Sequence, residues 1–96
     1  MAILTKSRVN YDADPAIINS TLAAVRSIQD LYPDAMATLE RQPPTSGFPT
    51  SGTYTHTRTW TNEADAQQFC IKIAALLDAS PTLRQFIISD PAVVVT

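Results

Sequence analysis

Two stretches of the chain carry charged and aromatic side chains at alternate positions, the spacing that places side chains on one face of a strand. In 53–61 these positions hold Tyr, His, Arg and Trp, and in 2–11 they include Lys and Arg. If the two strands are neighbours, four hydrogen-bond donors would lie between two aromatic rings, which suits a small anionic or aromatic ligand. The candidate ligand or interface residues are Lys6, Arg8, Tyr54, His56, Arg58 and Trp60.

The same residues also suit a contact between two copies of the chain. In that interpretation Trp60 and Tyr54 anchor the interface. Arg58 would then pair with Glu40 on the adjacent strand, and Lys6 would lie at the rim. Binding of nucleic acid is the least favoured interpretation, because the net charge is −2, the pI is about 5.0 and no RNA-recognition sequence run is present.

No catalytic residue is assigned. His56 could act as a general base, since its ordinary pKa lies near neutrality, but no orienting carboxylate is evident in the sequence. Cys70 lies beside the apolar stripe of an expected helix, where a thiol usually behaves as a small apolar group.

No metal or cofactor is expected either. One cysteine and one histidine leave no Cys/His cluster for zinc, and the aspartates are spread over element ends rather than gathered in one loop. Both glycines, Gly47 and Gly52, lie in one loop, which excludes a glycine-rich phosphate or dinucleotide motif.

The first half of the chain predicts a strand, a helix and a second strand. Alternation over 2–11 indicates the strand, and Asp14 followed by Pro15 is typical of a helix start. Apolar residues then recur at helical spacing until Pro33. The stretch 34–42 is ambiguous in composition, but its short length between prolines favours a strand.

The second half predicts a loop, a strand, a helix, a short helix and a final strand. The loop is 43–52, rich in Pro, Gly, Ser and Thr, and expected to be exposed and mobile. The strand 53–61 ends at Asn62, which can cap the second long helix. A short helix is expected over 82–88, and the β-branched run 92–95 is expected to form a well-buried strand.

One face of the strand 53–61 holds five threonines and the other holds the aromatic and basic residues. Tyr54 and Trp60 would bury more area, but Thr5 and Ser7 of the first strand match a small, partly polar inner layer. We therefore expect the threonines to face the helices and the face with Trp60 to be the uncovered one.

The segment Thr57–Phe69 combines an Arg-x-Trp strand end, a polar cap, acidic residues and Ala-x-x-Phe. It resembles the third strand and second helix of small dimeric α+β-barrel proteins. The resemblance covers thirteen of the 96 residues and carries over no catalytic residue. It implies ferredoxin-like subunits that pair through the bare sheet face; some members are cofactor-independent monooxygenases and many have no known activity.

The sequence therefore predicts a single α+β domain over 1–96: a two-layer, ferredoxin-like βαββαβ sandwich of two main helices and a four-stranded antiparallel sheet. The expected function is a small, non-catalytic protein that self-associates as a dimer through its open sheet face, or that meets a protein partner. The alternative is a cofactor-independent enzyme or ligand binder with its pocket between helices and sheet. Without a leader or a run of about 18 apolar residues, a soluble, cytoplasmic protein is expected. Such short accessory proteins are common in compact genomes such as those of phages.

Overall fold

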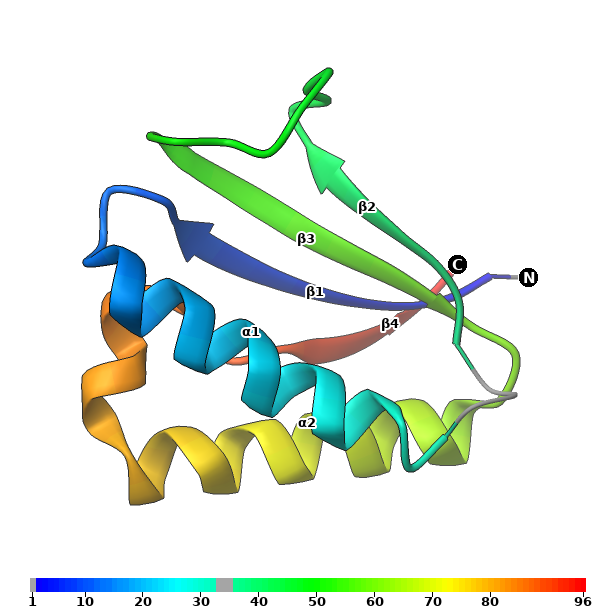
Figure 1. Cartoon of the computed structure of the whole chain (residues 1–96). Coiled ribbons are helices and arrows are strands. Elements are labelled where there is room, and N and C mark those ends of the chain that lie inside the picture. The colour runs from blue at the N-terminus through cyan, green and yellow to red at the C-terminus, as the bar shows by residue number, and fades with distance from the viewer. Residues whose placement is uncertain (1, 33–35) are drawn as a thin grey trace.

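The structure is a computed structural model that describes residues 2–32 and 36–96. Two α-helices and a four-stranded sheet lie in two layers, with both helices on one side of the sheet (Figure 1), which confirms the α+β class. In chain order the elements are β1 (Ile3–Asn10), α1 (Pro15–Gln29), β2 (Met36–Gln42), β3 (Thr53–Trp60), α2 (Glu63–Ala79), the 3-10 helix η1 (Pro81–Gln85) and β4 (Ala92–Val95). The ambiguous stretch is therefore a strand over 36–42, while residues 34 and 35 lie outside the described residues.

The sheet has the order β2-β3-β1-β4, and each neighbouring pair is antiparallel. Consequently β1 and β2 run in the same direction, with β3 between them. The register places Ile3 opposite Trp60, and Thr5 opposite Arg58. Residues opposite one another share a face of the sheet. The odd-numbered side chains of β1 therefore lie on the same face as the even-numbered side chains of β3.

The helices begin where the sequence predicts. The Asp14 carboxylate accepts a hydrogen bond from the Ala16 amide at 2.8 Å, and Pro15 takes the first helical position, where no amide donor is needed. The Asn62 side chain accepts from the Asp65 amide at 3.2 Å in the same way. None of the described helices is long and apolar enough to cross a membrane.

The face of β3 that meets the helices is the opposite of the one expected. Trp60 is only 3% exposed; its ring centroid lies 4.9 Å from that of Phe69 on α2, and its indole Nε1 donates to Thr5 Oγ1 at 2.9 Å. The expectation that the threonines face the helices, with Trp60 uncovered, is therefore wrong. Burying a large ring gains more free energy than burying a threonine methyl, and Thr5 supplies the acceptor that a buried indole N–H needs.

The outer face of the sheet, on the side away from the helices, carries threonines on β3 flanked by charged side chains. In the central row Lys6 lies opposite Thr57, and Thr57 lies opposite Glu40. The Thr57 hydroxyl is buried, and no described residue forms a hydrogen bond with it.

The last strand is less buried than expected. β4 lies at the sheet edge, where it pairs only with β1, and Val94 and Val95 are 38% and 42% exposed. Val93 alone of these three packs against the core, because it shares the face of its register partner Thr5.

Replacing Trp60 with Ala should cost about 3–5 kcal/mol of unfolding free energy, because a fully packed indole and its hydrogen bond are lost. Thr59→Ala, on the outer face of the same strand, should cost less than about 1 kcal/mol. Urea unfolding followed by far-ultraviolet circular dichroism measures both losses. Tryptophan fluorescence cannot serve for both variants, because Trp60 is the only tryptophan and Trp60→Ala removes it. Equal losses would contradict the assignment of the two faces.

Candidate functional site

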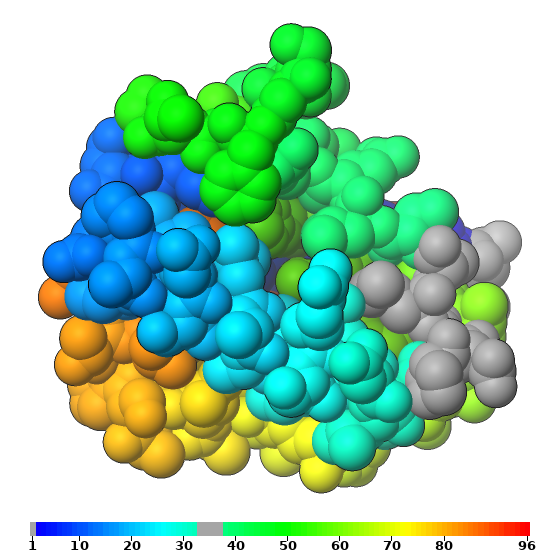
Figure 2. Space-filling model, viewed as in Figure 1, coloured from blue at the N-terminus to red at the C-terminus, as the bar shows by residue number. Residues whose placement is uncertain are grey.

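A cleft of about 1270 Å³ lies between α1 and the β2–β3 side of the sheet. Figure 2 shows it as a hollow between α1 and the green surface of β2 and the 43–52 loop. Its walls come from both layers: Leu22 and Val25 of α1 face Leu39 and Arg41 of β2 across the opening. The cleft exists because α1 stands away from β2, which leaves the inner face of that edge strand uncovered.

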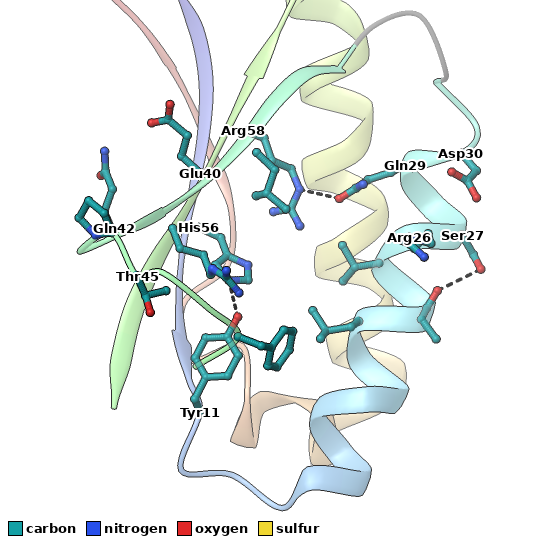
Figure 3. A pocket seen from close by; sticks show the side chains of 17 residues that line it. Tyr11, Arg26, Ser27, Gln29, Asp30, Glu40, Gln42, Thr45, His56 and Arg58 are labelled. Atoms are coloured by element: carbon teal, nitrogen blue, oxygen red, sulfur yellow. Dashed lines mark hydrogen bonds between the residues drawn. The ribbon is translucent and has the colours of Figure 1, made fainter. Parts of the chain in front are cut away.

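Arg58 lies at the inner end of the cleft and is only 5% exposed. Its Nε donates to Gln29 Oε1 of α1 at 2.7 Å (Figure 3). The central guanidinium carbon lies 5.1 Å from the centre of the Phe69 ring. Burial lowers the pKa of Arg58 to about 10, so the group is still cationic at neutral pH.

No carboxylate pairs with Arg58 in the described part of the chain, where the ion pairs join Arg84 to Asp78 and Asp90. The expected pair between Arg58 and Glu40 does not form. The register sets Glu40 opposite Thr57, on the other face of the sheet from Arg58, so Glu40 lines the cleft without pairing with Arg58 (Figure 3). Arg58 is thus a buried cation held by a neutral amide and an aromatic ring.

His56 neighbours Arg58 on the same face of β3 and is 4% exposed. Its Nε2 lies 2.8 Å from the Tyr11 hydroxyl, a partner that the sequence did not reveal. Burial, with help from the charges of Arg58 and Arg41, lowers the pKa of His56 to about 4. Burial also raises the pKa of the Tyr11 hydroxyl, against the opposing effect of Arg41. At neutral pH both members of this pair are uncharged.

The 43–52 loop forms one rim of the cleft. Arg41 Nη2 donates to the Gly47 carbonyl at 3.1 Å, and its guanidinium lies 5.5 Å from the centre of the Phe48 ring. Phe48 in turn meets Tyr11 edge-on, with 5.6 Å between ring centroids. The loop ends at Gly52, whose φ of +89° suits glycine and whose carbonyl accepts from the Tyr11 amide at 2.8 Å. Several contacts therefore join this loop to β2 and to Tyr11, just after β1.

The six candidate residues are divided between two faces. His56 and Arg58 line the cleft, while Tyr54 and Trp60 lie on the same inner face but pack in or against the core. Lys6 and Arg8 are exposed on the outer face, opposite Thr57 and Thr55, so the shared face expected for all six does not form. Among the cleft residues that sequence reasoning missed are Tyr11, Gln29, Arg41 and Phe48.

The cleft is suited to binding a negative charge. Three arginines line it: Arg58 at the inner end, Arg41 at the rim and the exposed Arg26. They outnumber the two acidic lining residues, Asp30 and Glu40. No group of three or more metal-binding side chains comes together among the described residues. Burial raises the pKa of the nearby Cys70 thiol, so the thiol stays protonated at neutral pH.

Comparison of the chain with models of known protein families, with curated proteins and with solved structures finds no match in any of the three.

His56 should make the protein less stable as the pH falls. Its pKa is about 4 when folded against an ordinary 6.5, so the unfolded chain binds more protons between those values. The free energy of unfolding should therefore drop as the pH falls from about 6.5 to 4, by on the order of 3 kcal/mol from this residue.

Urea unfolding at a series of pH values measures this drop. His56→Gln is the control. Subtracting its profile removes the contribution of the carboxylates, which titrate in the same pH range, to the free energy of unfolding. Parallel profiles for the two proteins would show that His56 is not held neutral by the fold.

Proposed function

We propose that this protein binds a small organic anion in the cleft between α1 and β2–β3, with Arg58 as the anchor. The observation that carries the proposal is a guanidinium that is 5% exposed, lines an open cleft and has no carboxylate partner among the described residues. An anionic ligand would supply the missing counter-charge.

The energetics support this role. Removing a cation from water costs several kcal/mol unless an opposite charge compensates it. Gln29 and the Phe69 ring orient the Arg58 side chain but add no negative charge. A binding site tolerates such a cost because the negative charge of the ligand compensates the buried cation. At a purely structural position no ligand supplies that charge.

This proposal corresponds to the alternative raised by the sequence, a small-molecule site between the helices and the sheet. No catalytic role is proposed. His56 is neutral and bonded to Tyr11, and no serine, threonine or cysteine among the described residues of the cleft is hydrogen-bonded to a basic side chain. The ferredoxin-like grouping and the likeness to dimeric α+β-barrel proteins are also proposals, supported by the βαββαβ order of elements along the chain.

Arg58→Met should abolish anion binding and leave the protein as stable as before or more stable, since a buried uncompensated charge is replaced by an apolar chain. The probes are 1-naphthoate and 1-naphthyl phosphate, titrated by calorimetry, with unfolding measured in parallel. Arg8→Met, on the outer face of the sheet and outside the cleft, is the matched control and should retain binding.

Two results would contradict the proposal. One is that neither anion binds the natural protein; the other is that Arg58→Met binds the anions as well as the natural protein does. A large loss of stability in Arg58→Met would instead assign Arg58 a structural role.

Self-association through the outer face of the sheet is a second candidate, and a specific arrangement favours it. Lys6 and Glu40 flank Thr57 on opposite sides, and neither forms an ion pair with a described residue. A two-fold axis parallel to β3 would bring Lys6 of one copy against Glu40 of the other, on both sides of the axis. Trp60 is buried in the core, so it is not available to anchor this interface.

If this second candidate is right, light scattering should give a dimer mass at high concentration. Lys6→Glu and Glu40→Lys should each weaken the dimer by placing like charges together, and the double variant should restore it. A monomer at every concentration for the natural protein, or no restoration in the double variant, would rule out this arrangement.

A further inference from the structure

The atoms of Arg58 that are free to bind a ligand are its two terminal nitrogens. Nε is engaged by Gln29 at 2.7 Å, and the guanidinium lies over the Phe69 ring. No described residue accepts a hydrogen bond from Nη1 or Nη2. The orientation of the guanidinium plane is fixed by these two contacts, so a ligand meets a planar fork of two parallel N–H donors.

A carboxylate matches this fork, because its two oxygens are coplanar and accept two parallel N–H bonds. The charge also matches. Arg58 provides the one buried positive charge of the cleft; Arg41 is half-buried at the rim and engaged with the Gly47 carbonyl, and Arg26 is exposed to water. A phosphate monoester carries about two negative charges, but the site holds one buried cation. The second negative charge would lose its water without a buried positive charge to compensate it.

The rest of the cleft is suited to an apolar body. Leu22 and Val25 of α1 form one wall, and Leu39 of β2 and Phe48 of the loop lie on the other side. Leu39 and Phe48 are 45% and 62% exposed, which leaves apolar surface that a ligand can cover. The volume of about 1270 Å³ is far larger than a carboxylate group alone requires.

We infer that the ligand is a monocarboxylic acid with an apolar body, of the aromatic or fatty acid class. The carboxylate lies on the Nη1–Nη2 fork of Arg58, and the body extends between Val25, Leu39 and Phe48 towards the mouth. This inference rests on the proposed anion-binding function and adds the chemical class of the anion.

Four probes test it by calorimetric titration of the natural chain: 1-naphthoate, 1-naphthyl phosphate, 1-naphthamide and acetate. The naphthoate should bind more than about tenfold tighter than each of the other three. The amide lacks the charge, acetate lacks the apolar body, and the phosphate carries a second charge.

Matched variants locate the apolar body. Leu39→Ser should weaken naphthoate binding more than about fivefold, because Leu39 lines the cleft. Leu31→Ser is the control: Leu31 is 60% exposed and does not line the cleft, so binding should be unchanged. Equal effects of the two variants would overturn the placement of the body.

The outcomes separate this inference from the function on which it rests. Tighter binding of the phosphate than of the naphthoate would overturn the monocarboxylate class while leaving anion binding intact. Acetate binding as tightly as naphthoate would overturn the apolar body alone. Equal binding of the amide and the acid, or no binding of either naphthyl anion, would overturn both.

Discussion

The pairing of β1 with β3 determines which side chains reach the helix layer, and the core and the cleft both depend on it. In this register Thr5 lies opposite Arg58, and Ile3 lies opposite Trp60. The indole N–H of Trp60 donates to Thr5 across the two strands, which gives the register a buried polar contact as well as apolar packing. A shift of one residue would exchange the faces of β3 and move both the Trp60 ring and the Arg58 guanidinium to the outer side of the sheet.

In the proposed function, Arg58 has opposite effects on stability and on binding. The Phe69 ring and Gln29 hold its guanidinium at the inner end of the cleft, but the described residues supply no negative charge to compensate it. The neighbouring Trp60 and Phe69 pack tightly and offset part of that cost. Because α1 stands away from β2, the same guanidinium remains accessible from the cleft, and this combination of burial and access makes Arg58 the anchor in the proposed function.

Local signals in the sequence predicted the elements well, but not the face of β3 that is buried. The Asp14 and Asn62 caps and the alternation of β3 each act within a few residues, so they are visible in the chain. The β1–β3 register joins strands more than forty residues apart, and no local pattern specifies it. Two missed cleft residues do have weak signals in the sequence. Gln29 lies four residues after Val25, on the same face of α1, and Arg41 lies two residues after Leu39, on the same face of β2. Phe48 lies in a loop without periodicity, so only the folded chain reveals its contact with Tyr11.

Side-chain nitrogen spectra of the arginines, recorded by nuclear magnetic resonance during a titration with 1-naphthoate, test the central claim most directly. The account predicts that the Nη resonances of Arg58 shift and saturate with the ligand, because its two terminal nitrogens receive the carboxylate. The exposed Arg8, on the outer face of the sheet, should not respond. Arg58 resonances that stay fixed while the ligand binds would show that the anion is held elsewhere and would contradict the account.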